Sequence, residues 1–245
     1  MAAVGKGAPL RWLENLYLRR HLRGKGIEIG GLWRKFKVPA QAKVWYLDRL
    51  SVEELKKQYA ELDCGIVTPD LIADAEQLPV ASGSLNFLIA SHVLEHLRFP
   101  LLALKSWYDA LTPGGILVLK VPDKRYTFDR DRQRTPLQHL VQESENPRGF
   151  DVRAHYADWV HHVNRYAPGQ PDFKRQLGHL LDMNYSIHYH VWIDRDLVEI
   201  IQHTQQVFQL DWTPIVFWGA HFYRKECVLV LKKSRCRMRR ELSGL

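Results

Sequence analysis

The sequence predicts one doubly wound α/β domain that carries a mostly helical insertion. Over the first half of the chain, short apolar segments typical of buried parallel strands alternate with helical segments. From 123 to 190 the sequence is rich in Arg, Asp, His, Tyr and Pro, and it lacks strand-like runs until its end. A chain of 245 residues can bury one substantial core, so we interpret 1–245 as a single domain with this insertion.

The first half contains five predicted strands. The alternation with helices predicts that these strands lie parallel in one sheet, with helices on both faces. A helix over 11–22 precedes them, with Leu13, Leu16, Tyr17 and Arg20 on one stripe. The predicted strands span 27–29, 44–47, 66–72, 85–90 and 116–121.

The helices between the strands have recognisable first turns. Ser51 is followed three residues later by Glu54, which is the capping-box pattern for a helix over 51–59. A proline opens the next predicted helix, 100–111, as is common at a first helical position. The run HVLEHL, at 92–97, also has a helical composition.

Residues 191–233 are predicted to close the sheet after the insertion. Asp194 caps a helix whose apolar residues recur at i, i+3 and i+4. Two strands, 207–218 and 227–232, then form an antiparallel pair, and a basic tail follows at 234–245.

Most of the formal net charge of +8 lies near the C-terminal end. Residues 232–245 carry six Lys and Arg against Glu241, which leaves only +3 for the other 231 residues and argues against nucleic acid as a partner. No apolar run is long enough for a membrane span or a secretion signal, so we expect a cytoplasmic protein. Cys64, Cys227 and Cys236 lack metal-type spacing and are expected to be free thiols.

Small and polar residues follow the predicted strands at the edge of the sheet where ligands bind in parallel α/β folds. Glycines let a ligand approach the backbone, and the carboxylates can accept hydrogen bonds from ribose hydroxyls and an adenine amine. Each of these residues also has an alternative, structural role. The pair Gly30 and Gly31 can simply form a turn, Asp48 can cap the following helix, and Asp74 can form an Asx-turn. The residues expected at a cofactor are Gly30, Gly31, Asp48, Asp74, Ala75, Ser91 and His92.

Five motifs in chain order resemble the class I S-adenosylmethionine-dependent methyltransferases, in particular the branch that acts on small molecules. They are IEIGG, YLD, ADAEQLP, FLIASHVLEHL and LTPGGILVLKVPD. The resemblance covers 24–122, which makes this the cofactor-binding half, and returns at 194–233. It implies a Rossmann-like sheet of seven strands with an antiparallel last strand, S-adenosylmethionine as cofactor, and Glu28 as a further cofactor-binding residue. Residues 30–34 read GGLWR where the family commonly has Gly-x-Gly-x-Gly, so we expect this loop to follow a different path.

The insertion, 123–190, is where we expect the acceptor to be selected. Its segments PDKRYTFDRDRQRTPLQHL, HYADWV and IHYHVW resemble methyltransferase-like proteins, some of them from bacterial surface-polysaccharide clusters, which implies a small carbohydrate acceptor. Two other functions stay open. The pI near 9.4 allows methylation of RNA, and the altered first loop allows a degenerate, non-catalytic domain that binds a nucleoside or a partner protein.

A general base for a hydroxyl acceptor is expected near the fourth and fifth strand ends or at the end of the insertion. His188 and His190 share a face if their segment is extended, and with His155, or with His161 and His162, they could bind a metal ion. Ordinary hydrogen bonding or substrate contact is the favoured role, so the sequence predicts no metal site. The candidates for catalysis are His96, Asp123, His188 and His190.

Overall fold

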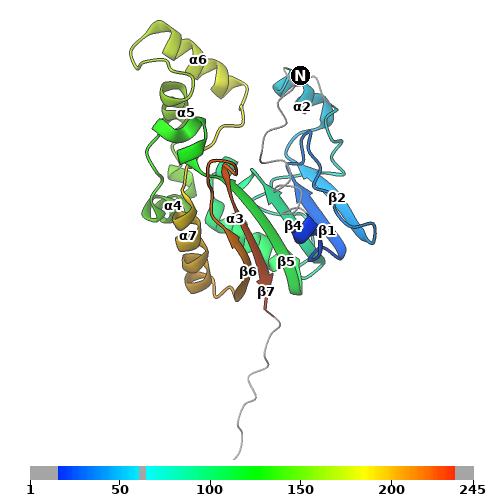
Figure 1. Cartoon of the computed structure of the whole chain (residues 1–245). Helices are drawn as coiled ribbons and strands as arrows, with labels where there is room; N and C mark the ends of the chain where they lie inside the picture. Colours follow the sequence, from blue (N-terminus) through cyan, green and yellow to red (C-terminus); the bar gives the residue numbers. More distant parts are fainter. Residues whose placement is uncertain (1–15, 61–64, 235–245) are drawn as a thin grey trace, which may run out of the picture.

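The computed structural model describes residues 16–60 and 65–234, which form a seven-stranded sheet with helices packed on it and an extension beyond one sheet edge (Figure 1). The strand order is β3-β2-β1-β4-β5-β7-β6. The first five strands pair in parallel, and β7 is antiparallel to both of its neighbours. The predicted fold class is therefore confirmed. The start of the predicted first helix, nearly all of the basic tail, Cys64 and Cys236 lie outside the described residues.

The strands fall close to their predicted positions, with three differences. The fifth begins at Leu111, five residues earlier than predicted, because Leu111 already pairs with Leu85. The third is much shorter than 66–72, because only Leu71 and Ile72 pair with the second, and Pro69 has no N–H to donate to a neighbouring strand. The sixth begins later than predicted, because Val207 still belongs to the preceding helix. The strands are β1 (Gly24–Ile29), β2 (Ala42–Asp48), β3 (Leu71–Ile72), β4 (Leu85–Ser91), β5 (Leu111–Pro122), β6 (Trp212–Trp218) and β7 (Glu226–Lys233).

The predicted helices are also present, with one exception. HVLEHL does not form a helix but only a short 3₁₀ turn, η1 (Leu94–His96), because His92 adopts a positive φ of 57° immediately after β4. The other 3₁₀ turns are η2 (Lys124–Tyr126), η3 (Phe128–Asp131) and η4 (Pro147–Gly149). The α-helices are α2 (Val52–Gln58), α3 (Pro100–Ala110), α4 (Leu137–Glu145), α5 (Val152–His162), α6 (Pro171–Asp182) and α7 (Asp194–Val207).

Two helix starts test the capping predictions. At α2 the capping box is present: the Glu54 N–H donates to the Ser51 hydroxyl at 3.3 Å, and the Ser51 N–H donates to the Glu54 carboxylate at 2.9 Å. At α7 the predicted cap is wrong by one residue. Asp194 is the first helical residue, Ile193 occupies the cap position, and the Ile193 N–H donates to Asp196 at 3.0 Å.

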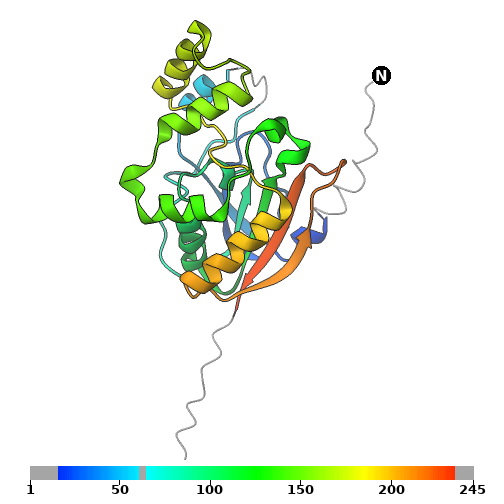
Figure 2. The same ribbon diagram turned by 90° about the vertical axis from the view of Figure 1, so that its left-hand side faces the viewer.

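The two faces of the sheet are covered differently (Figures 1 and 2). Helices α3 and α7 bury their apolar residues against one face, and α4 packs beside them. In the part of the chain that the structure describes, a short N-terminal helical stretch and residues near Phe36 pack on the other face. The predicted apolar stripe of this stretch is wrong, since Leu18 and Leu22 are fully buried while Leu16 and Tyr17 are exposed.

The insertion has a small core of its own beyond the carboxyl ends of the strands (Figure 1). Apolar residues of α5 and α6 pack there against residues 187 and 189 of the segment that returns to the sheet. Trp159, Leu177 and Ile187 are among its buried members. No helix in the described ranges is long and apolar enough to cross a membrane.

Candidate active site

A cavity of about 690 Å³ lies at the carboxyl ends of β1, β2 and β4. The strand ends and α2 line one side of it, and the segment just before α3, 97–99, lines the other together with residues 184–186 and Tyr189 of the insertion. In Figure 1, α2 and α6 stand on either side above these strand ends. The volume is within the range of about 300–1,000 Å³ that is usual for small-molecule sites.

The loop after β1 forms a tight turn at the cavity wall. Gly30 has a φ of +64°, and its N–H donates to the Leu47 carbonyl at 2.9 Å. A Cβ atom at Gly30 would lie 3.1 Å from the Val93 side chain, so a larger residue would be strained both in backbone conformation and in space. Leu32 also has a positive φ, of 35°, and the loop forms no helix before β2. These two positive φ angles define the turn that leads from β1 toward β2.

Glu28 lies beside this loop, outside the cavity lining. Its side chain is buried, and its two carboxylate oxygens accept from the Phe36 N–H at 2.9 and 3.0 Å. Burial raises the pKa of Glu28 to about 7, although the Phe36 hydrogen bond and the charge of Lys35 act in the opposite direction. The carboxyl group thus holds the far end of the loop in position.

Asp48 lines the cavity at the end of β2. Burial raises the pKa of its carboxyl group, while the N–H groups of Leu50 and Arg49 and the charge of Arg49 oppose that shift. The Arg49 guanidinium donates to the Asn184 carbonyl at 3.1 Å, which joins this strand end to the insertion. A partly buried carboxylate is therefore fixed at the cavity wall.

Asp74 and Ala75 line the cavity after β3. Asp74 makes the Asx-turn that was its alternative role: its Oδ1 accepts from the Glu76 N–H at 2.8 Å. The backbone carbonyl of Ala75 accepts from the indole N–H of Trp107 at 2.7 Å. Trp107 is fully buried on α3, so this helix fixes the backbone at the cavity wall.

His92 and His96 line the cavity after β4. His92 Nε2 lies 2.7 Å from the Glu226 carboxylate. Burial lowers the pKa of His92, but its contacts with Glu226 and Glu95 outweigh that effect and raise it to about 10. For His96, burial and the neighbouring His188 ring lower the pKa to about 4. The two rings therefore carry different charges at neutral pH.

His188 lies behind His96, outside the cavity lining. The two rings meet edge to face with centroids 4.6 Å apart. His188 Nδ1 donates to Asp129 at 2.7 Å, and Asp129 also accepts from Arg132 at 2.9 Å. Glu95 completes this buried group, with its Oε1 atom 4.0 Å from His188 Nε2.

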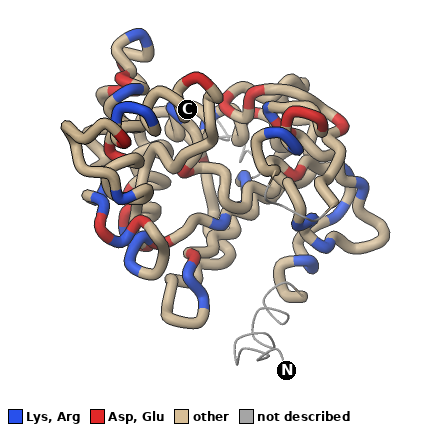
Figure 3. The backbone as a smooth tube through the Cα atoms, turned by 90° about the horizontal axis from the view of Figure 1, so that it is seen from above, with Lys and Arg blue, Asp and Glu red and all other residues tan. Residues whose placement is uncertain are grey.

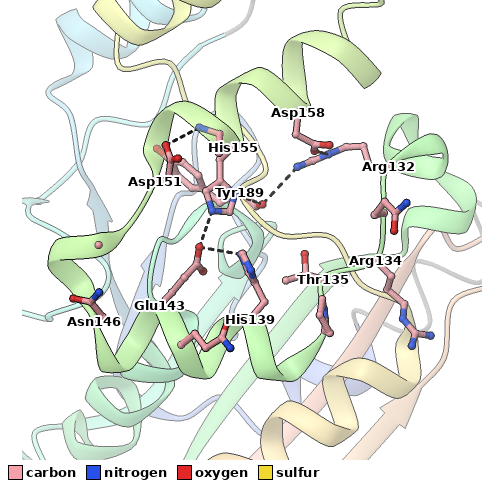
Figure 4. A pocket seen from close by; sticks show the side chains of 15 residues that line it. Arg132, Arg134, Thr135, His139, Glu143, Asn146, Asp151, His155, Asp158 and Tyr189 are labelled. Carbon is pink, nitrogen blue, oxygen red and sulfur yellow. Dashed lines mark hydrogen bonds and ion pairs between the residues drawn. The ribbon is translucent and has the colours of Figure 1, made fainter. Parts of the chain in front are cut away.

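His190 belongs to a second histidine cluster, formed with His139, His155 and Glu143. Figure 4 shows the other three of these residues. His139 and His155 lie 2.9 and 2.7 Å from the same Glu143 oxygen, and His190 lies 3.6 Å from the other. Burial lowers the pKa of His190 to about 3. Beside this cluster a separate cavity of about 490 Å³ opens, which is lined by α4 and α5. His188 and His190 thus take part in different clusters.

Asp123 lies at the end of β5, outside the cavity lining. It is 1% exposed and accepts from the Arg125 side chain at 2.6 and 2.9 Å and from the Asp194 N–H at 3.2 Å. These contacts join the end of β5 to the start of α7. Its surroundings are those of a structural carboxylate.

The cavity brings together six of the twelve site residues expected from the sequence. Gly30, Asp48, Asp74, Ala75, His92 and His96 line it. Glu28, Gly31, Ser91, Asp123, His188 and His190 do not line it. Sequence reasoning missed Arg49, Arg98, Phe99, Asn184, Ser186 and Tyr189. The signal for Arg49 was its place beside Asp48, whereas the return of 184–189 to the cavity depends on how the insertion folds.

A family model described as a methyltransferase domain matches residues 19–204. No curated protein is similar enough in sequence to match.

Solved structures share the fold at low sequence identity. A putative Zn-dependent alcohol dehydrogenase from Rhodobacter sphaeroides is 17% identical with a TM-score of 0.56, and the match covers 91% of this chain and 90% of that one. An S-adenosylmethionine-dependent methyltransferase from Mesorhizobium loti is 12% identical with a TM-score of 0.52, covering 93% and 98%. For a CurJ carbon methyltransferase, 17% identical with a TM-score of 0.46, the match covers 90% of this chain but only 54% of the other. At these identities, the likeness to the two structures with TM-scores above 0.5 shows the fold alone.

Proposed function

The chain belongs to the methyltransferase domain family and is an S-adenosylmethionine-dependent methyltransferase, and we propose that it methylates a small hydroxylated acceptor such as a sugar or sugar nucleotide. The observation that carries the proposal is that the strand ends and the insertion line opposite sides of the same cavity of about 690 Å³. In this arrangement, the strand ends of 24–122 bind the cofactor, and 123–190 supplies the acceptor side together with residues 97–99.

The cofactor is assigned to the strand-end side of the cavity. Asp48 accepts hydrogen bonds from the ribose hydroxyls, and Asp74 accepts from the adenine amine through the oxygen that its Asx-turn leaves free. The Ala75 N–H donates to the adenine ring, and the tight turn at Gly30 gives the ligand access to the backbone. The methyl-bearing end of the cofactor then faces the histidines after β4.

The acceptor is assigned to the side of the cavity formed by the insertion and by the segment just before α3. Arg98, Asn184 and Ser186 offer polar groups there, and Phe99 and Tyr189 offer aromatic rings. Polar groups that bind hydroxyls beside rings that stack on apolar faces suit a sugar. Basic and acidic residues are interspersed around this end of the molecule (Figure 3), which favours a small acceptor over RNA.

The reaction needs alignment of the two ligands and, for a hydroxyl acceptor, removal of its proton. The methyl group of the sulfonium is already electrophilic, so the cavity has to hold the acceptor oxygen in line with the bond from carbon to sulfur. Burial of both ligands in one cavity also excludes competing water.

Transfer of a labelled methyl group from S-adenosylmethionine tests this proposal directly. The acceptor panel contains monosaccharides, nucleotide sugars and RNA, and we expect label in one of the sugars and none in RNA. Substitution Arg98→Ala is expected to raise the KM for the acceptor by about tenfold, the effect of losing one hydrogen bond to a charged group, with cofactor affinity unchanged.

Arg153→Ala is the matched control, because Arg153 is exposed on α5 and does not line the cavity. It is expected to behave as the wild type. Label in RNA would contradict the proposal and indicate an RNA methyltransferase. Cofactor binding without transfer to any sugar would contradict it and indicate a non-catalytic binding domain.

A further inference from the structure

We propose that Glu95, His96 and His188 bind a divalent transition-metal ion such as Zn²⁺, and that this ion holds the acceptor oxygen for methylation. The role of the ion rests on the proposed function, whereas the site itself rests on side-chain geometry. One donor atom from each of the three residues lies within 4.8 Å of the other two. Donors held by one ion at about 2.0–2.2 Å lie roughly 3–3.5 Å apart, so small side-chain movements complete the site.

Glu95 is a buried carboxylate that the described part of the protein leaves incompletely satisfied. Its side chain is 1% exposed, and neither oxygen has a hydrogen-bond partner among the described residues. The nearest cationic atom, His92 Nδ1, lies 3.5 Å from Oε1, which is an ion-pair distance. Buried carboxylates without hydrogen bonds are costly, and a bound cation would remove that cost.

The surroundings of the two histidines leave the same ring nitrogen available on each. His96 Nδ1 lies 2.9 Å from the Ile187 carbonyl, which can only accept, so Nδ1 carries the proton and Nε2 keeps its lone pair. His188 Nδ1 donates to Asp129 at 2.7 Å, which leaves its Nε2 free in the same way. A ring N–H donated to a carbonyl or carboxylate is the usual support of a metal-bound histidine.

The donor set indicates the class of ion. Two imidazoles and one carboxylate are typical of zinc and other first-row transition metals, whereas Mg²⁺ and Ca²⁺ prefer oxygen donors. Three protein ligands also leave at least one coordination position open. His96 lines the large cavity, so that position is accessible to an acceptor bound there.

The second histidine cluster is the weaker candidate (Figure 4). In that cluster, His139 and His155 both contact Glu143 at hydrogen-bond distance, and His155 also donates to the Tyr189 carbonyl at 3.0 Å. The Oε1 atom of Glu143 is therefore paired without an ion, and only Oε2 lacks a hydrogen-bond partner, whereas both oxygens of Glu95 lack one among the described residues. This cluster provides a matched control of similar composition.

An ion at Glu95, His96 and His188 supplies what the reaction lacks, which is a means of activating the hydroxyl. Coordination lowers the pKa of a bound hydroxyl group, and its proton passes to water. The oxygen then forms a bond to the methyl carbon while the bond from carbon to sulfur breaks and its electron pair stays on sulfur. The products are the methyl ether, S-adenosylhomocysteine and one proton.

Titration of the full-length protein with Co²⁺, followed by visible absorption, and zinc content after dialysis test the site. The wild type is expected to bind one ion. Glu95→Gln and His188→Asn are each expected to weaken Co²⁺ binding by about 100-fold or more, and Asp129→Asn by about 10- to 100-fold. His139→Gln, in the other cluster, is expected to bind as the wild type does.

Affinity for S-adenosylhomocysteine, measured on the same samples, shows whether a variant that has lost metal binding is still folded. It also tests the proposed function independently of the proposed metal site. Retained cofactor affinity in Glu95→Gln with lost metal binding supports the inference. Absence of metal binding in the wild type, or its loss in His139→Gln and not in Glu95→Gln, overturns it and leaves the proposed function intact. Metal binding without cofactor binding would overturn the proposed function and the ion's role in it.

Discussion

Glu28 is a carboxyl group whose burial makes the stability of the protein depend on pH. It supports the loop after β1 through the Phe36 N–H, and burial raises its pKa from about 4.5 to about 7. A raised carboxyl pKa means that the folded state binds the proton more tightly than the unfolded state. Its contribution to stability is therefore complete below about pH 4.5 and is lost as the pH rises through about 7.

Glu28→Gln is expected to remove this pH dependence, because glutamine is neutral at every pH and keeps an oxygen for the Phe36 N–H. Relative to the wild type, the variant should gain about 3 kcal/mol in unfolding free energy between pH 4.5 and pH 8. Urea denaturation at several pH values measures this difference, with Glu53→Gln on the exposed side of α2 as the control. Parallel curves for wild type and Glu28→Gln would show that the carboxyl group titrates normally.

At the scale of elements, Asp123 joins the end of β5 to the start of α7. It was a catalytic candidate from the sequence because it directly follows a strand. In the fold its oxygens accept from Arg125 and from the Asp194 N–H, and the side chain does not line the cavity. We therefore expect its substitution to affect stability rather than chemistry.

Asp123→Asn is expected to lower the unfolding free energy by about 2–3 kcal/mol, because it replaces a buried charged acceptor with an amide that can accept only at one end. Urea unfolding measures the loss. The exposed pair of Asp131 with Arg165 provides a control, and Asp131→Asn is expected to leave the unfolding free energy close to that of the wild type, because solvent screens an exposed ion pair. Unchanged stability with a large loss of kcat would instead assign Asp123 to catalysis.

Most elements could be predicted from local sequence patterns, and the exceptions have local causes. The capping box of α2 and the apolar runs of β1, β2 and β4 depend on neighbouring residues, so the sequence indicates them directly. The short β3 and the 3₁₀ turn η1 depend on pairing and on a positive φ at His92, neither of which periodicity reveals. The buried side of the first helical stretch depends on the opposite sheet face, which the sequence does not identify.

At the scale of the whole molecule, the predicted sheet brings the cofactor candidates together but does not predict the histidine clusters. Residues at the ends of parallel strands meet at one edge by topology, so Gly30, Asp48 and Asp74 could be grouped from the sequence. His188 joins His96 and Glu95 only because the insertion folds back over the strand ends. A return over nearly 100 residues has no local sequence signal.

Calorimetric titration with S-adenosylhomocysteine tests the central claim, that the strand-end cavity is the cofactor site. We expect the wild type to bind one equivalent. Asp48→Ala is expected to bind about 10- to 100-fold more weakly, because the ribose hydroxyls lose a charged acceptor. Glu53→Ala, at an exposed site, is expected to bind like the wild type. Absence of binding in the wild type, or unchanged affinity in Asp48→Ala, would contradict the claim.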